Sequence, residues 1–459
     1  MISSKFKILP IIVLLIGLAS IATAVTGNLR FMDKFNGNLS AWTTSASGGT
    51  VTIVTQNNSP KLKLSDTSRS ASVSVTHSYT EPPELYIIEF DMKMVADGDV
   101  VKAQLLSSDD AIIAEVDLGS TSDTVSFDTD NATASMKTWA NDVYKQVIFV
   151  IDVANDDITC YISGASHTYY PLDIVGAAKS YSGTAIAKLR FTTTDAAQAV
   201  AYIDEVRIFT PDIAIIGDSI ADGKPMWSAD PAYPNRLLTA EDETSPPSYQ
   251  LSQKIEGTTR VPSSVWVSDR AWGGTRFKDN SQPNCCDMYG HMQKVLDQGF
   301  KTIILCAGHN DITQGDDATK IEGDLNQIIK IVQKAGITGS HIVLCTIPPA
   351  LSINTTSERK AMDTYNSWIV TRAGELGAKL ADIYTALKDD KDPYILKAAY
   401  NKSDGTHLTV LGSNVLAGSI YNAMFAGTEQ IGNPGGTIRN VEGSDEGSIR
   451  RKVGSEKVK

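Results

Sequence analysis

Cysteine is scarce in this sequence: there are five among 459 residues, and only Cys160 lies in the first half of the chain. So few thiols, odd in number and unevenly placed, exclude the disulfide framework of small secreted proteins. Cys306 and Cys345 lie in apolar runs that predict buried strands, which favours packed thiols over a bridge. Cys285 and Cys286 are adjacent in a loop-like stretch without a Cys-x-x-Cys pair or a His at ligand spacing. We therefore predict no metal site.

Positive charge is also in short supply, since 41 Lys and Arg stand against 53 Asp and Glu, for a formal net charge of -12. The phosphates of nucleic acids and the surfaces of anionic membranes repel such a chain, so we expect neither as a partner. A phosphate-binding loop is missing as well, because no GxxxxGK[ST] or GxGxxG motif follows a predicted strand. Apart from the N-terminus, no segment resembles a transmembrane helix, and we expect no stable membrane association.

The N-terminus carries a targeting pattern. Lys5 and Lys7 precede an apolar run from Ile8 to Ile21, and Ala22-Thr23-Ala24 follows it. This order of charge, apolar run and small residues is typical of a secretory signal peptide. The run is short for a membrane span, and no Cys follows where bacterial lipid attachment would need one. We predict that residues 1–24 are a signal peptide and that the mature protein is secreted.

Residues 25–209 alternate between polar and apolar side chains, which predicts half-buried strands. Glu89-Phe90-Asp91-Met92-Lys93-Met94 places its apolar residues on one face, and 147–153 with 158–162 predicts a hairpin around Asn155 and Asp156. The segment 202–209 predicts a last strand. We expect an antiparallel β-sandwich, and the order of its strands resembles the concanavalin-like jelly rolls that accompany secreted glycan-active enzymes.

Aromatic residues of this first half leave two roles open. Trp42, Trp139, Tyr169 and Tyr170 could stack on sugar rings if they share an exposed surface, or they could pack in the core. The sandwich is accordingly a carbohydrate-binding or accessory domain, or a spacer or lid over the second half.

From residue 210 to 427 strand-like runs alternate with amphipathic segments of helical length, which predicts a doubly wound α/β domain of flavodoxin-like type. The predicted strands are 213–216, 265–267, 302–307, 341–347 and 379–383, and the predicted helices are 288–298, 318–335, 359–376 and 408–425. The remainder, 428–459, is glycine-rich and then charged, which is typical of a flexible tail.

Polar and glycine-rich motifs stand where the predicted strands end, and ligands bind beyond the carboxyl ends of strands in an open parallel sheet. Gly217-Asp218-Ser219 follows the first strand, Trp272-Gly273-Gly274 the second, and Gly308-His309-Asn310-Asp311 the third. Glycines allow backbone N–H groups to face a ligand, and an Asn amide adds a donor. This is the composition that an oxyanion hole needs.

The segment Asp404-Gly405-Thr406-His407 precedes the last predicted helix. A carboxylate three residues before an imidazole can orient it within one local turn, as the Asp of a Ser-His-Asp triad does. Together with Ser219 at the first strand end, this spacing predicts nucleophilic catalysis.

In this combination the sequence resembles the SGNH (GDSL) hydrolases. GDSI at Gly217, a Gly after the second strand, GHND at Gly308 and DGTH at Asp404 match the four blocks of that family in order and placement, over Pro211 to Gly427. The resemblance implies an esterase that needs no cofactor.

The resemblance also implies the role of each site residue. Ser219 would attack the ester carbonyl, His407 would carry its proton, and Asp404 would orient His407. The N–H groups of Ser219 and Gly273 and the amide of Asn310 would form the oxyanion hole. Gly274 is the alternative to Gly273, and Trp272 departs from the small residue usual in the family.

The substrate stays open within this class. Secretion, the acidic surface and the β-rich domain favour removal of acetyl or similar short acyl groups from extracellular glycans, so we expect an acylated small molecule or polysaccharide as partner. Two alternatives remain: a glycan-binding or adhesion protein with a degenerate hydrolase half, and an O-acyltransferase that passes the acyl group to a sugar hydroxyl. Nothing in the sequence specifies an oligomeric state.

Overall fold

The computed structural model describes residues 27–425, with gaps at 57–58, 69, 96–99, 119–123, 139–143, 163–172, 176–177, 195–198, 224–245, 259–262 and 279–286. Several features named above lie outside the described residues: the segments 1–24 and 428–459, Trp139, Tyr169, Tyr170, Cys285 and Cys286.

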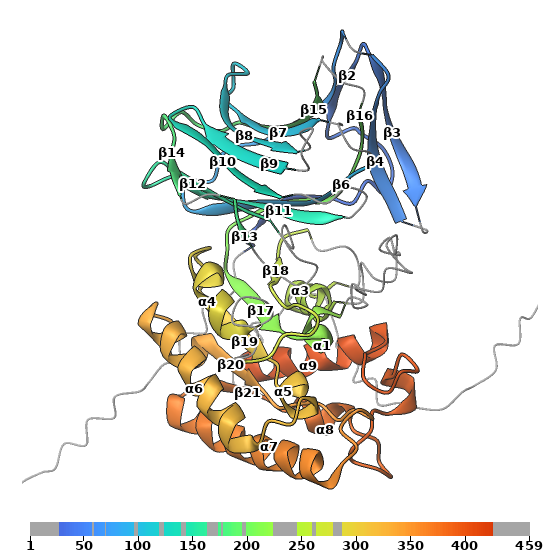
Figure 1. Ribbon diagram of the computed structural model, residues 1–459, viewed down its shortest axis with the longest axis vertical. Coiled ribbons are helices and arrows are strands. Elements are labelled where there is room, and N and C mark those ends of the chain that lie inside the picture. Colours follow the sequence, from blue (N-terminus) through green and yellow to red (C-terminus); the bar gives the residue numbers. More distant parts are fainter. Residues whose placement is uncertain are drawn as a thin grey trace, which may run out of the picture.

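The first half of the chain forms two antiparallel sheets packed face to face, which confirms the predicted sandwich (Figure 1). The first sheet has the spatial order β13 (Asp173–Ile174), β12 (Asp157–Ile162), β11 (Lys145–Asp152), β6 (Tyr86–Met94), β16 (Ala199–Phe209), β4 (Ser59–Asp66) and β3 (Gly49–Gln56), with β1 (Leu29–Asp33) paired to β16 and β14 (Lys179–Ser180) paired to β12. The second has the order β10 (Ala132–Thr138), β9 (Thr124–Thr129), β8 (Ile112–Leu118), β7 (Val101–Leu106), β15 (Lys188–Thr193), β5 (Val73–Ser78) and β2 (Thr43–Ala46).

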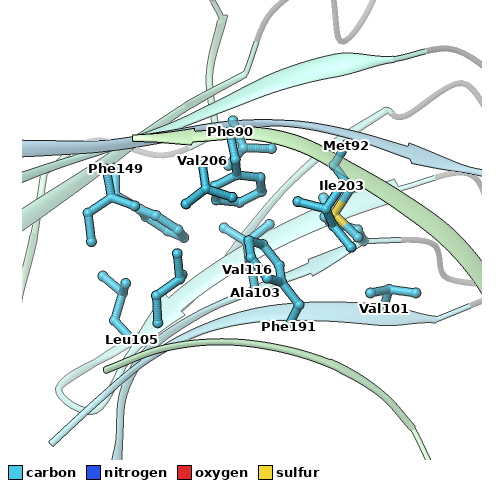
Figure 2. Close-up of a cluster of buried hydrophobic side chains, with 14 of the residues drawn as sticks. Phe90, Met92, Val101, Ala103, Leu105, Val116, Phe149, Phe191, Ile203 and Val206 are labelled. Carbon is cyan, nitrogen blue, oxygen red and sulfur yellow. The ribbon is translucent and has the colours of Figure 1, made fainter. Parts of the chain in front are cut away.

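Apolar side chains from the facing sides of both sheets fill the space between them. Phe90, Phe149 and Phe191 meet there, and the Phe90 and Phe191 rings lie edge to face with centroids 4.8 Å apart (Figure 2). Trp42 belongs to the same core: it is 7% exposed, and its Nε1 donates to Asp33 Oδ2 at 2.7 Å. Of the two roles left open for Trp42, the structure selects core packing.

Strand β6 departs from the predicted half-buried pattern, because every residue from Tyr86 to Met94 is buried. Phe90, Met92 and Met94 face the sandwich core, as the alternation predicts. The opposite face, with Ile87 and Glu89, is covered as well, because the second domain packs against this sheet. The alternation identified the core face correctly but took the other face to be in solvent.

The second domain contains the predicted parallel sheet flanked by helices on both faces. Its strands have the spatial order β18 (Val267–Asp269), β17 (Ile213–Gly217), β19 (Thr302–Cys306), β20 (Ile342–Cys345) and β21 (Lys379–Ala381). Numbered along the chain this is the flavodoxin-like order 2-1-3-4-5, whose switch point lies between β17 and β19.

Helices cover the two faces of this sheet separately (Figure 1). One face packs against α4 (Met288–Leu296), α6 (Ala318–Lys334) and α7 (Thr356–Leu376), and the other against α1 (Ser219–Asp222), α3 (Pro247–Glu256), α8 (Ile383–Leu387) and α9 (Val410–Phe425). The other short helices within the described residues are α5 (His309–Thr313) and two 3₁₀ turns, η1 (Gly339–His341) and η2 (Ala398–Tyr400). None of the helices in the described part of the chain combines the length and hydropathy that a bilayer crossing needs.

Several predicted strand boundaries differ from the observed ones. Strand β18 begins at Val267, the last residue of the predicted strand, because Val265 and Trp266 are buried without pairing with β17. His341 belongs to the 3₁₀ turn η1, so β20 starts one residue later. The thiols of Cys306 and Cys345 are free and buried, as their apolar runs predict, and that of Cys160 is also free and buried.

Candidate active site

The predicted nucleophile lies at the carboxyl end of strand β17. Ser219 is the first residue of α1, separated from β17 by Asp218 alone, and it is 4% exposed. Asp218 caps this helix by accepting a hydrogen bond from the N–H of Ile220 at 3.0 Å. Only glycine fits at position 217, because a Cβ there would collide with the carbonyl oxygen of Cys306 and with Ala221. The motif therefore fixes where the hydroxyl of Ser219 stands.

A chain of hydrogen bonds connects this hydroxyl to the DGTH segment. His407 Nε2 lies 2.9 Å from Ser219 Oγ, and His407 Nδ1 lies 2.6 Å from Asp404 Oδ2. The other oxygen of Asp404 accepts the backbone N–H groups of Thr406 and His407 at 2.9 and 2.8 Å. The structure thus brings the three predicted residues into the arrangement of a Ser-His-Asp relay.

The Asp404 carboxylate is held in its charged form. Partial burial acts against ionisation, but the hydrogen bonds from His407 and Thr406 outweigh it and keep the pKa of Asp404 below its usual value. A carboxylate that stays ionised accepts from Nδ1–H and leaves Nε2 without a proton, facing the serine.

Two glycines follow β18 beside the nucleophile. Trp272 N–H donates to the carbonyl of Gly217 at 3.0 Å, so this segment continues alongside β17. Thr275 N–H donates to the Trp272 carbonyl at 3.2 Å and closes a four-residue turn in which Gly274, third in the turn, has φ +80°. This is the type II pattern, which requires a glycine-like residue at that position. The N–H groups of Gly273 and Gly274 have no acceptor among the described residues.

Asn310 lies in the first turn of α5, after the central strand β19. Its Nδ2 donates to the carbonyl of Thr275 at 3.0 Å, which connects α5 to the glycine turn. An amide nitrogen carries two hydrogens, so one remains for a ligand. The structure therefore places every predicted oxyanion donor at one edge of the sheet.

The two acidic residues of the motifs support the backbone. Asp311 accepts the N–H of Phe277 with both oxygens, at 3.1 and 3.2 Å, and burial raises its pKa to about 7. Burial likewise raises the pKa of Asp218 to about 6, against the hydrogen bond from Ile220. Neither residue belongs to the hydrogen-bond chain of Ser219, His407 and Asp404.

Leu351 and Ser352, which the sequence did not identify as site residues, contact the DGTH segment. Ser352 Oγ lies 3.1 Å from His309 Nε2 and 3.0 Å from Thr406 Oγ1, and Leu351 N–H donates to the Gly405 carbonyl at 2.8 Å. These residues follow β20, so they belong to the same edge of the sheet. Their position after a strand was the one available signal, because a Leu-Ser pair has no distinctive chemistry.

His309 is a buried neutral imidazole, 4% exposed, whose Nδ1 has no hydrogen-bond partner among the described residues. Burial, and then the proximity of His407, lower its pKa to about 4. Because so little of the His309 side chain is exposed, little of its surface is accessible to a substrate.

Acid should therefore destabilise the protein through His309. Its folded pKa lies below the unfolded value, so its contribution to stability is complete above about pH 6.5 and is lost as the pH falls towards 4. Between these pH values we expect the wild type to lose about 3 kcal/mol more unfolding free energy than His309→Gln. Urea unfolding at both pH values checks this, with exposed His341→Gln as control. Equal acid sensitivity of the wild type and His309→Gln would contradict it.

Comparisons with known proteins bear on the second domain. Residues 215–415 match the model of the GDSL-like Lipase/Acylhydrolase family, and this range contains Ser219, Asn310, Asp404 and His407. A search of curated proteins found no match.

Solved structures resemble parts of the chain at low identity. A G-D-S-L family lipolytic protein from Desulfitobacterium hafniense is 13% identical over 46% of this chain and 98% of its own, with a TM-score of 0.34. A GDSL-like lipase from Bacteroides thetaiotaomicron is 15% identical over 47% and 88%, with a TM-score of 0.32. A sialidase is 14% identical over 41% of this chain but 19% of its own length, with a TM-score of 0.32. The match identifies residues 215–415 as a GDSL-like lipase/acylhydrolase domain.

Proposed function

We propose that this protein is a secreted serine esterase that removes short acyl groups, above all acetyl, from carbohydrate. The observation that carries the proposal is the hydrogen-bond chain from Asp404 through His407 to Ser219, with lengths of 2.6 and 2.9 Å. The family match at residues 215–415 supports ester hydrolysis in general, and the hydrogen-bond chain identifies the groups that would perform it.

In the first half-reaction, Ser219 Oγ attacks the ester carbonyl carbon while its proton passes to His407 Nε2. The tetrahedral intermediate then collapses, and His407 gives the proton to the leaving alcohol. Asp404 stabilises the imidazolium that exists between these two transfers. The acyl group is left on Ser219, and in the second half-reaction water takes the place of the alcohol.

The oxyanion of each tetrahedral intermediate would accept hydrogen bonds from the N–H of Ser219, from the glycine turn and from Asn310 Nδ2. Both glycines remain candidates, because neither N–H has an acceptor among the described residues. The positive φ of Gly274 explains why the chain uses Gly there, whereas Gly273 has no such requirement. The bond from Asn310 to Thr275 would hold side-chain and backbone donors in one frame.

Acyl length and substrate class rest on further considerations. Ser219 is 4% exposed and the neighbouring Trp272 is half-buried, which favours a small acyl group over a long chain. The N-terminal sequence pattern, the net charge of -12 and the attached β-sandwich favour an extracellular, glycan-linked ester.

Hydrolysis of p-nitrophenyl acetate, butyrate and palmitate tests the acyl length. We expect kcat/KM to be highest for acetate and to fall with chain length, and we expect acetate release from acetylated polysaccharides. Palmitate as the best substrate would overturn the short-chain proposal. Absence of turnover on every ester would favour the glycan-binding alternative.

An acyltransferase would use the same residues, with a sugar hydroxyl in place of water. Supplying acceptor glycans together with p-nitrophenyl acetate separates the two activities. A hydrolase releases one acetate for each p-nitrophenol, whereas a transferase releases less and acetylates the acceptor.

A further inference from the structure

The β-sandwich and the α/β domain share a continuous packed interface. Ile87, Ile148 and Phe209, on the outer face of the first sheet, belong to the same buried cluster as Trp266 and Phe300 of the α/β domain. In Figure 1 the sheet containing β6 and β11 is the sandwich layer nearer the α/β domain. The sandwich is therefore packed directly onto the hydrolase domain.

A buried ion pair crosses this interface. Arg270 Nη2 donates to Glu89 Oε2 at 2.9 Å, and each side chain is 1% exposed. Glu89 Oε1 accepts from Arg207 Nη1 at 3.1 Å, so its two oxygens serve one Arg from each domain. The other nitrogens of Arg270 donate to Gln298 Oε1 and to the carbonyl of Asp269, both at 2.8 Å. Each nitrogen of the Arg270 guanidinium thus donates a hydrogen bond, and the only carboxylate among these acceptors comes from the sandwich.

Arg270 lies at the base of the glycine turn. Its own N–H donates to the Ile215 carbonyl at 2.8 Å, next to the pairing of Trp272 with Gly217. Only Ala271 and Trp272 separate Arg270 from Gly273, and this short segment is extended alongside β17. A change in the position of the Arg270 backbone therefore moves the turn against Ser219.

We propose that Glu89 is a positioning residue of the esterase, and that the sandwich uses its ion pair with Arg270 to fix the glycine turn that faces Ser219. The inference rests on the proposed function, in which this turn supplies an oxyanion donor. Through this ion pair the sandwich would be a structural part of the active site, in addition to any accessory role. Displacement of an oxyanion donor by about 1 Å lowers the rate by up to roughly 100-fold. An ion pair that holds the glycine turn in place therefore increases the rate.

Glu89→Gln tests this proposal, with Asp204→Asn as matched control. Asp204 is also buried on this sheet, 1% exposed and paired with Lys61, but it has no bond to Arg270. Both variants remove one buried carboxylate from the same sheet, so both should lower the unfolding temperature. Only Glu89→Gln should lower kcat, by roughly 10- to 100-fold at nearly unchanged KM, measured well below the unfolding temperature of each variant. Glu89→Asp keeps the charge and should have a smaller effect of the same kind, and it replaces Glu89→Gln if that variant does not fold.

Amide hydrogen exchange over residues 270–277 provides a readout that does not depend on activity. We expect faster exchange there in Glu89→Gln than in the wild type or Asp204→Asn. Unchanged exchange in this segment, or an equal loss of kcat in the control, would overturn the proposal. If the wild type hydrolyses no ester, the proposed function fails, and the exchange measurement still decides whether Glu89 positions the turn.

Discussion

Ser219→Ala should lower kcat for p-nitrophenyl acetate by roughly 10⁴- to 10⁶-fold while the protein stays folded. In the proposed mechanism the hydroxyl bonds to the acyl carbon, so its loss removes the covalent route and leaves the weaker assistance of the oxyanion donors. Steady-state rates with matched circular dichroism spectra and unfolding temperatures give the measurement.

A second serine serves as control for the substitution itself. Ser367 is exposed on α7 and bonds to the carbonyl of Asp363 at 2.8 Å, remote from the relay in the sequence and in its contacts. Ser367→Ala should retain full activity. Substantial turnover by Ser219→Ala would mean that another nucleophile, or water without a covalent step, performs the reaction.

Asp404→Asn should lower kcat by about 10⁴-fold without disturbing the loop. The amide oxygen can still accept the N–H groups of Thr406 and His407, which preserves the local turn. The amide nitrogen, however, donates to His407 Nδ1 and thereby places the remaining imidazole proton on Nε2, facing Ser219. In that tautomer the imidazole cannot take the hydroxyl proton.

The matched control is Asp382→Asn. Asp382 also follows a strand of the parallel sheet, and it caps α8 by accepting the N–H of Thr385 at 3.0 Å. The Asp382→Asn variant should have a lower unfolding free energy and unchanged activity. If Asp404→Asn kept more than a tenth of the wild-type kcat, Asp404 would not be orienting the imidazole.

The candidate active-site end of the fold could be predicted from the sequence because the motifs with polar and glycine residues lie at the ends of predicted strands. Gly217 to Ser219, Gly308 to Asn310 and Asp404 to His407 each follow a short apolar run or precede a helix, and the parallel sheet brings these ends to one edge. The hydrogen bonds among Ser219, His407 and Asp404 agree with that expectation. Their catalytic roles stay predictions until the variants are measured.

The domain interface could not be predicted in this way. Glu89 alternates with apolar neighbours, and such a pattern is the same whether the polar face meets water or another domain. Its burial is compensated by the charges of Arg207, on the same sheet, and of Arg270, 181 residues away in the sequence. The sequence offers no periodic signal for a pairing over that distance.

Helix α3 was missed for a related reason. Its residues Pro247 to Glu256 are mostly polar, and the buried ones include Ser248, Gln250 and Ser252. Ser252 Oγ is buried because it accepts the N–H of Val267 at 2.8 Å, at the start of β18. Polar side chains with tertiary hydrogen bonds can fill a core without producing the apolar stripe that marks a helix in the sequence.

Covalent labelling of the nucleophile tests the central claim most directly. A fluorophosphonate ester mimics the tetrahedral intermediate and reacts with a serine only where a base and oxyanion donors activate it. Peptide mapping by mass spectrometry should find one adduct, on Ser219, that is absent in Ser219→Ala and much slower to form in Asp404→Asn. Ester hydrolysis that persists with Ser219 unlabelled, or a stoichiometric adduct on a different residue, would contradict the acyl-enzyme mechanism.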